Sequence, residues 1–143
     1  MARIKVDWPG TASFQCRLAV RITDLNYGGH VGNDTVLSLV HEARMQYLRH
    51  LGYTEMQFAG TGMIMADAAI EFKSELFYGD TVNVSMQAQP AGRIGFDLFY
   101  KLEKESEGRN ILVALVKTGM ICYDYEKKKI VSMPQEAVEN MKM

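Results

Sequence analysis

The segment TDLNYGGHVGNDTVLSLVHEARMQYLRHLG, residues 23–52, decides the fold. Its first ten residues are rich in glycine and small polar side chains, a composition typical of a turn. From Asn33 or Asp34 to Leu51, apolar side chains recur with helical spacing. The apolar side of this predicted helix is broad and comprises Val36, Leu37, Leu39, Val40, Ala43, Tyr47, Leu48 and Leu51. A helix with so wide an apolar surface needs a large partner to cover it.

Both ends of the predicted helix carry recognisable signals. Asn33 and Asp34 are residue types that commonly cap helix N-termini, and Gly52 suits the left-handed position that follows a helix. The adjacent Gly28 and Gly29 allow positive φ and a close approach of the backbone to a ligand. The helix therefore has an entry turn that is suited to binding.

The remaining chain alternates as β-strands do. Residues 13–22 place apolar side chains at every second position, which predicts a half-buried strand. Four further strand-like segments follow at 63–77, 81–89, 93–104 and 111–125. The separators between these four are short and predict an antiparallel meander. Residues 54–58 and 134–143 are expected to form short helical turns, and residues 130–132 a last strand.

Bulk composition fits one soluble domain. The chain has 143 residues, 48% hydrophobic and 23% charged, with a formal net charge of -1. Nothing in this balance points to a nucleic acid or a membrane surface, since both favour a basic patch. The N-terminus lacks the apolar run of a secretory signal, and no metal-ligand cluster is evident. Cys16 and Cys122 are interpreted as free buried thiols, so we expect a cytoplasmic protein.

Polar residues crowd the entry turn and point to acyl chemistry. A helix N-terminus offers unpaired N–H groups and a positive dipole end, which can hold an oxyanion. Nearby stand side chains that could position or deprotonate water: Asp24, Asn26, His30, Asn33, Asp34 and Glu42. Each has a purely structural alternative. Asp24, Asn33 and Asp34 could only cap the helix, His30 could be a hydrogen-bonded turn residue, and Glu42 a solvated surface charge.

These residues resemble a known motif. Asp24-Leu25-Asn26, Gly29-His30-Val31-Gly32-Asn33 and Glu42-Ala43-Arg44 look like the helix-entry motif of hotdog-fold acyl-CoA thioesterases of the 4-hydroxybenzoyl-CoA thioesterase type. Residues 69–80, AIEFKSELFYGD, are similar to that family's long second strand and its Gly-Asp turn. The order of elements agrees over residues 12–125. The resemblance implies an α+β hotdog fold for a single domain, residues 1–143, in which a curved antiparallel sheet wraps the helix.

The resemblance also implies an activity and an assembly. It implies hydrolysis of an acyl-CoA or related thioester at the boundary between subunits of a homodimer or tetramer, with no cofactor beyond the coenzyme A of the substrate. The backbone N–H of Asn33 would face the thioester carbonyl oxygen. Gly29, Val31, Gly32 and Lys73 would contact substrate. Lys73 and Arg93 are candidates for the coenzyme A phosphates.

Two departures from the family motif leave the base open. The family's catalytic Asp is replaced by Asn26, which can orient water but cannot act as a general base. Gly32 stands where the family often has Asn. Asp24, His30, Glu42 and Asp67 remain candidates for the base. Asp67 lies in an apolar run and could face the pocket, or it could lie on the exposed face of the sheet, paired with a lysine or arginine.

Two rival functions follow from the same residues. His30 with Glu42 resembles the His and helix Glu of hotdog hydroxyacyl dehydratases, although those carry a Pro-Gly pair at the helix entry that this chain lacks. Loss of the family's Asp could also leave a protein that binds acyl-CoA without cleaving it. The ten methionines suit an adaptable acyl pocket, but ordinary core packing explains them equally.

Overall fold

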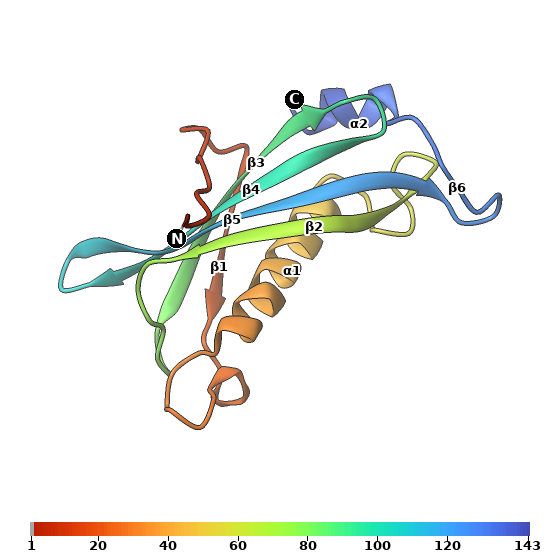
Figure 1. Ribbon diagram of the computed structural model, residues 1–143. Helices are drawn as coiled ribbons and strands as arrows, with labels where there is room; N and C mark the ends of the chain where they lie inside the picture. The colour runs from red at the N-terminus through yellow and green to blue at the C-terminus, as the bar shows by residue number, and fades with distance from the viewer. Residues whose placement is uncertain (1) are drawn as a thin grey trace.

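The computed structural model describes residues 2–143 and contains one long helix lying against a curved antiparallel sheet (Figure 1). This is the arrangement that the sequence predicts. The elements in chain order are β1 (Phe14–Ala19), the 3-10 turn η1 (Ile22–Asp24), α1 (Asn33–His50), β2 (Gly62–Phe72), β3 (Thr81–Ala91), β4 (Gly95–Ser106), β5 (Arg109–Asp124), β6 (Lys129–Ile130) and α2 (Gln135–Asn140).

The strand order corrects one prediction. The sheet runs β1-β3-β4-β5-β2, with β6 paired to β5, so β3, β4 and β5 form the predicted meander. The prediction that β2 joins the same meander is wrong, because β2 pairs with β5 at the far edge of the sheet. Residues 73–77, expected to be strand, instead leave the ladder. The N–H groups of Lys73 and Ser74 both donate to the carbonyl of Val113, and Leu76 is buried.

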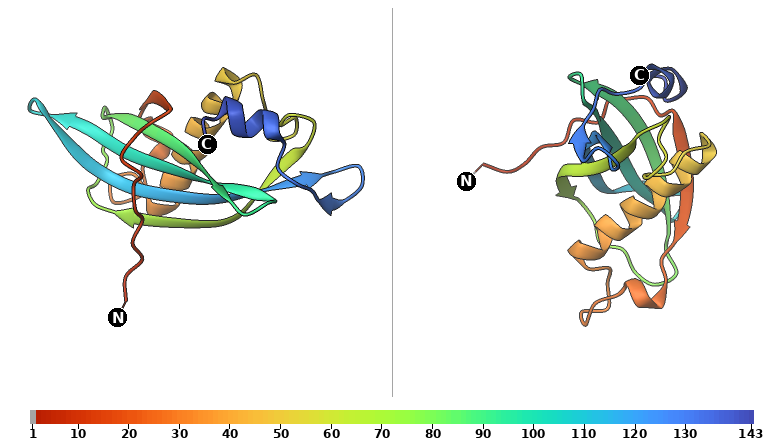
Figure 2. Two further views of the ribbon diagram at one scale, coloured as in Figure 1. Left: turned by 90° about the horizontal axis from the view of Figure 1, so that it is seen from above. Right: turned by 90° about the vertical axis from the view of Figure 1, so that its right-hand side faces the viewer.

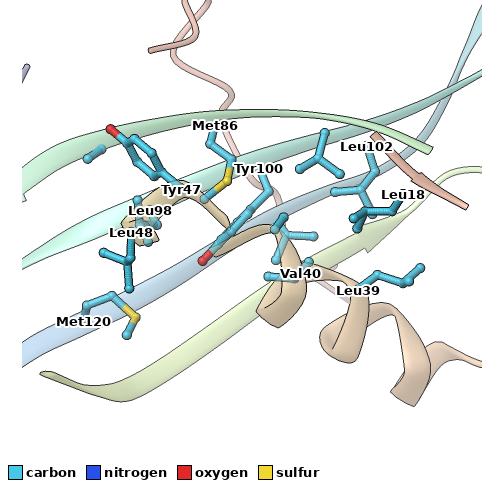
Figure 3. Close-up of a cluster of buried hydrophobic side chains, with 14 of the residues drawn as sticks. Leu18, Leu39, Val40, Tyr47, Leu48, Met86, Leu98, Tyr100, Leu102 and Met120 are labelled. Atoms are coloured by element: carbon cyan, nitrogen blue, oxygen red, sulfur yellow. The ribbon is translucent and has the colours of Figure 1, made fainter. Parts of the chain in front are cut away.

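Helix α1 lies in the concave side of the sheet (Figure 2). Its apolar side chains belong to one buried cluster with those of the central strands. Tyr47 and Leu48 are almost fully buried, as the helical periodicity predicts. They share one cluster with Leu98 and Tyr100 of β4 and Met120 of β5 (Figure 3). Burial of each such side chain contributes about 1.5–3 kcal/mol. The sheet therefore fixes the helix, and with it the position of the turn that precedes the helix.

The sequence predicts the C-terminal end of α1 correctly, but not the residue that caps its N-terminus. Gly52 has φ +84° and the N–H of Tyr53 donates to the carbonyl of Leu48 at 2.8 Å, so the helix ends as predicted. At the other end the cap is Gly32 rather than Asn33 or Asp34, and no side chain caps the helix. The predicted helical turn at residues 54–58 is also absent from the described chain.

One buried side chain of α1 is charged. Arg44 donates from Nη1 to the hydroxyl of Tyr100 at 3.2 Å, and Tyr100 in turn contacts the hydroxyl of Thr118 at 2.8 Å. Its Nε lies 3.6 Å from the carboxylate of Glu55. Burial raises the pKa of Tyr100, so the hydroxyl stays protonated. This network ties the middle of α1 to the sheet and to the connector that follows the helix.

Candidate active site

The turn before α1 is a tight hairpin. Leu25 and Val31 form an isolated antiparallel bridge, and the N–H of Asn26 donates to the carbonyl of His30 at 2.9 Å. Gly29 sits at the tip with φ +81°, a conformation that glycine adopts without strain. The hairpin thus fixes His30 close to the N-terminus of α1.

A cavity of about 250 Å³ opens beside the N-terminus of α1. We call it the first cavity. Its wall combines the end of the hairpin, the first turn of α1 and the connector between β2 and β3. The lining residues are His30, Val31, Asn33, Val36, Phe72, Lys73, Ser74, Glu75, Leu76 and Val113. The first cavity therefore joins the helix N-terminus, a histidine and an apolar wall.

The ring of His30 is held through one nitrogen. Nδ1 lies 3.2 Å from the carbonyl oxygen of Val31, and because a carbonyl can only accept, Nδ1 must carry the proton of this hydrogen bond. In the neutral ring, Nε2 is then an acceptor. Nε2 lies 4.0 Å from a carboxylate oxygen of Glu75. The side chain is about one-third exposed, so Nε2 is accessible from the first cavity.

The first backbone N–H groups of α1 are available to a ligand. Gly32 accepts from the N–H groups of Thr35 and Val36, which begins the helical pattern. The N–H groups of Asn33 and Asp34 donate to no acceptor within residues 2–143. Free N–H groups at a helix N-terminus, together with the helix dipole, attract a negatively charged oxygen. The first cavity thus contains an anion-binding end of the helix.

A second cavity of about 280 Å³ lies on another side of α1, between the helix and β1. It is lined by Arg17, Leu18, Ala19, Arg21, Asp24, Ser38, Leu39, Glu42 and Gln46, and none of these residues lines the first cavity. The structure therefore separates two of the predicted site residues, Asp24 and Glu42, from His30 and Asn33.

Comparison with known proteins now identifies the family. The family model of the thioesterase-like superfamily matches residues 20–141. The chain belongs to that superfamily. A putative esterase of Aquifex aeolicus is 28% identical over 131 residues, which cover 90% of this chain and 98% of that protein.

Two further relatives name their substrates. A 1,4-dihydroxy-2-naphthoyl-CoA hydrolase of Thermosynechococcus vestitus is 30% identical over 118 residues, which cover 80% of this chain and 79% of the relative. A crystal structure of a mutant 4-hydroxybenzoyl-CoA thioesterase in complex with 4-hydroxybenzoyl-CoA has a TM-score of 0.81 at 15% identity, over 92% of this chain and 99% of that chain. The last likeness concerns the hotdog fold, which this thioesterase-like chain shares.

In this thioesterase-like protein Asp24 has a structural partner. Its carboxylate is buried and accepts from the backbone N–H of Arg21 at 2.8 Å, and its other oxygen lies 3.4 Å from the Arg21 guanidinium. The carboxylate thereby caps the 3-10 turn η1. Asp24 therefore stabilises η1, and it does not cap α1 as the structural alternative expected.

Glu42 lies in the second cavity with a thiol nearby. Its carboxylate accepts a long hydrogen bond of 3.4 Å from Gln46, one turn further along α1. Burial, assisted by the negative charge of Glu42, raises the pKa of Cys16 to about 11. The thiol of Cys16 therefore stays protonated at neutral pH and is a poor nucleophile.

Asn26 closes the hairpin from within. Its Oδ1 accepts from the N–H of Gly28 at 2.8 Å, which leaves the amide Nδ2 to donate elsewhere. A side chain at Gly28 would meet both Oδ1 of Asn26 and Nε2 of His30, at 3.2 and 3.3 Å. These two side chains therefore flank Gly28. The absent side chain at Gly32 leaves room for Oδ1 of Asp34, which would lie 2.6 Å from an added Cβ.

Asp67 lies on the face of the sheet away from α1. Its carboxylate accepts from the ammonium of Lys117 at 2.8 Å and from the N–H of Gly119 at 3.0 Å. The Lys117 hydrogen bond lowers the pKa of Asp67. Side chains alternate across a strand, and Thr118 points into the core, so Lys117 and Asp67 point outward. Asp67 is therefore paired with a lysine on the exposed face of the sheet.

The predicted phosphate contacts are separated. Lys73 lines the first cavity, where its ammonium lies 3.1 Å from Glu71. Arg93 lies in the turn between β3 and β4, beside the segment that leads to α2, at the other end of the sheet from the hairpin (Figure 1). A single bound molecule at the first cavity would meet Lys73 first.

The sequence did not predict that Glu75 lines the first cavity. The prediction of one strand over 63–77 assigned it to a sheet face, whereas it lies in the connector and lines the first cavity. The sequence does contain a sign that the strand ends here: Lys73-Ser74-Glu75 are three consecutive polar residues, which breaks strand alternation.

Within residues 2–143, no group of three or more His, Cys, Asp or Glu side chains is placed to hold a metal ion. No helix of this part of the chain is long and apolar enough to cross a membrane.

Proposed function

We propose that this protein hydrolyses an acyl-CoA thioester to a carboxylic acid and a free thiol, with the reaction centred on the first cavity. One observation carries the proposal: an accessible histidine nitrogen faces the same cavity as a helix N-terminus with free N–H groups. Acyl transfer to water needs both an oxyanion site and a group that accepts the proton of water. The related 1,4-dihydroxy-2-naphthoyl-CoA hydrolase supports coenzyme A as the thiol.

The reaction proceeds in two steps. A water molecule attacks the thioester carbonyl carbon while Nε2 of His30 takes one of its protons, and the carbonyl oxygen becomes an oxyanion held by the N–H of Asn33. The tetrahedral intermediate then collapses, the carbon–sulfur bond breaks, and His30 returns the proton to the leaving thiolate. Removing one oxyanion donor from such a site typically costs 10²–10³ in kcat, so the helix N-terminus is a major contributor.

The remaining site residues bind and orient. Asn26 cannot act as a general base. Its Nδ2 group donates a hydrogen bond that orients water or substrate at the hairpin. Val31 lines the first cavity, and Gly29 and Gly32 beside it would let a substrate approach the backbone closely. Lys73 would exchange its contact with Glu71 for a phosphate of coenzyme A. No metal or redox cofactor takes part.

We also propose that two copies of the chain associate through β2. This strand is an edge of the sheet, and its exposed apolar side chains include Ile64, Met65 and Phe72. An unpaired edge strand with apolar side chains favours pairing with another strand. Phe72 also lines the first cavity, so a partner seated on β2 would complete the wall of the site. Analytical ultracentrifugation distinguishes this dimer from a tetramer made of two dimers.

The expected location is the cytoplasm, and the whole chain is expected to act as one domain. Cys16 and Cys122 are both free thiols, which suits a reducing compartment. The family match extends over residues 20–141, nearly the full chain.

A screen for thiol release tests the proposal. The purified protein is incubated with short, long and aromatic acyl-CoAs, and free thiol is followed with a chromogenic disulfide. We expect turnover well above the background for at least one acyl class. Release of thiol also distinguishes this reaction from the hydration of an enoyl thioester, which leaves the thioester intact.

Asn26 favours one second candidate, a protein that binds acyl-CoA without cleaving it, because the family's carboxylate is absent there. The same screen decides between the two. Saturable binding of acyl-CoA with no thiol release for any acyl group would favour the binding protein and contradict hydrolysis.

A further inference from the structure

Glu75 is a carboxylate without an assigned role, and it faces His30 across the first cavity. We propose that Glu75 is a second catalytic group, which holds the hydrolytic water together with His30 and stabilises the positive charge that His30 gains. The inference rests on the hydrolytic function proposed above. It supplies a carboxylate to a site whose hairpin has Asn26 where the resembled motif has an aspartate.

The two groups are arranged as a pair of acceptors. Because Nδ1 of His30 donates to Val31, Nε2 is an acceptor in the neutral ring, and the Glu75 carboxylate is an acceptor as well. One water can donate its two protons to both, which leaves its lone pairs free to attack carbon. Two hydrogen bonds of about 2.8 Å at the angle of a water molecule span about 4.4 Å. The observed separation is 4.0 Å, and the Glu75 side chain is 62% exposed, so a small rotation accommodates the water.

The backbone around Glu75 is fixed although its side chain is free. The ammonium of Lys104 donates to the Glu75 carbonyl at 2.7 Å, and the N–H of Val31 donates to the carbonyl of Leu76 at 2.9 Å. Leu76 is 2% exposed and anchors the connector in the core. The Glu75 carboxylate accepts no hydrogen bond from residues 2–143. The backbone contacts therefore fix the position of Glu75 beside the first cavity, while its carboxylate stays free to turn toward a ligand.

Within residues 2–143, no other carboxylate lines the first cavity. Among the described residues that line the first cavity, Glu75 is the one with a carboxylate. Asp24 and Glu42 lie in the second cavity, and Asp67 points away from α1 and is paired with Lys117. Lys73 is within 3.1 Å of Glu71, so its charge is already engaged. Glu75 therefore faces His30 as its ionisable partner.

The reaction needs no reactant other than water and the thioester. One water proton passes to Nε2 of His30, the water oxygen bonds to the carbonyl carbon, and the carbonyl electrons move onto the oxygen. During this step the negative charge of the Glu75 carboxylate lies beside the newly charged imidazolium and lowers its energy. Collapse breaks the carbon–sulfur bond, and the imidazolium proton goes to the sulfur. The products are the carboxylic acid and the thiol.

The test compares Glu75→Ala, Glu75→Gln and Glu75→Asp with the wild type and with Glu105→Gln, an exposed glutamate at the C-terminal end of β4 that does not line the first cavity. On the best acyl-CoA of the screen, we expect Glu75→Ala and Glu75→Gln to lower kcat by about 10²-fold with KM changed by less than about threefold. Glu75→Asp should recover part of this loss, and Glu105→Gln should equal the wild type. Added formate should restore activity to Glu75→Ala, since an exposed site admits a small carboxylate.

Three outcomes would overturn the inference. If kcat of Glu75→Gln equals that of the wild type, Glu75 does not act on the water. If KM rises while kcat is unchanged, Glu75 binds substrate instead. If kcat falls but neither formate nor Glu75→Asp restores it, the role is structural. In all three the wild type still hydrolyses acyl-CoA, so the proposed function stands. A wild type that releases no thiol overturns the proposed function and this inference together.

Discussion

The two cavities beside α1 differ in what their polar groups are doing. In the second cavity Asp24 is buried and bound to Arg21, and Glu42 is bound to Gln46, so both carboxylates have partners. In the first cavity the N–H of Asn33, Nε2 of His30 and the Glu75 carboxylate have no hydrogen-bond partner within residues 2–143. Polar groups without partners are the ones that a ligand can satisfy. The two carboxylates of the sequence motif therefore already have partners, whereas the polar groups of the first cavity remain available to a ligand.

The largest expected effect concerns the base. Replacing His30 with Gln removes the acceptor for the water proton, and general base catalysis is worth about 10²–10⁴ in rate. We expect kcat/KM for thiol release to fall by that factor, while Glu42→Gln in the second cavity stays within about threefold of the wild type. A larger loss in Glu42→Gln than in His30→Gln would move the reaction to the second cavity.

The next effect concerns the oxyanion. Asn33 is the first residue of α1, a position that accepts proline, and Gly32 before it is extended, with φ -69° and ψ 154°. Asn33→Pro therefore removes one N–H without breaking the helix, and we expect kcat to fall about 10²–10³-fold. Asn33→Ala is the matched control, since it keeps the N–H. Equal activity of the two variants would show that this N–H does not hold the oxyanion.

We expect replacement of Asp24 to lower stability but not activity. Asp24→Ala removes the cap of η1 and leaves the N–H of Arg21 without its partner, which we expect to cost about 1–2 kcal/mol in the free energy of unfolding. Urea denaturation measures this cost. The folded variant should keep kcat within a few-fold of the wild type. A stable but inactive Asp24→Ala would make Asp24 a catalytic residue.

The smallest effect belongs to Asp67. The Lys117 hydrogen bond lowers the pKa of Asp67 in the folded protein, so its contribution is present above the unfolded pKa and is lost as the pH falls through the folded value. Because the pair is exposed, Asp67→Asn should cost less than about 1 kcal/mol at pH 7. The difference from the wild type should vanish well below pH 4. Unfolding curves at pH 7 and pH 3 compare the two, and an undiminished difference at pH 3 would contradict this pairing.

Much of the fold could be predicted because it depends on periodicity. The helix, its end at Gly52 and the strands β3, β4 and β5 follow from apolar spacing and short turns. The place of β2 could not be predicted in this way, because it depends on pairing with β5, more than forty residues away in the chain. The burial of Arg44 could not be predicted from apolar spacing either, because it depends on Tyr100 and Glu55, which are distant in sequence.

The candidate site was predictable only in part. The hairpin and the helix N-terminus could be located from glycines and capping residues, and His30 and Asn33 do share a cavity. The sequence could not separate Asp24 and Glu42 from them, because residues close together along a turn and helix can face different sides of that helix. Glu75 arrives at the cavity from a connector whose path depends on the topology of β2.

A structure of the Glu75→Gln variant with a non-hydrolysable acyl-CoA analogue tests the central claim most directly. The analogue carries a ketone in place of the thioester, so its carbonyl oxygen reports where the oxyanion forms. The account predicts that this oxygen lies within hydrogen-bond distance of the N–H of Asn33, about 2.7–3.2 Å, with its carbon facing His30 in the first cavity. An acyl carbonyl bound in the second cavity, beside Asp24 and Glu42, would contradict it.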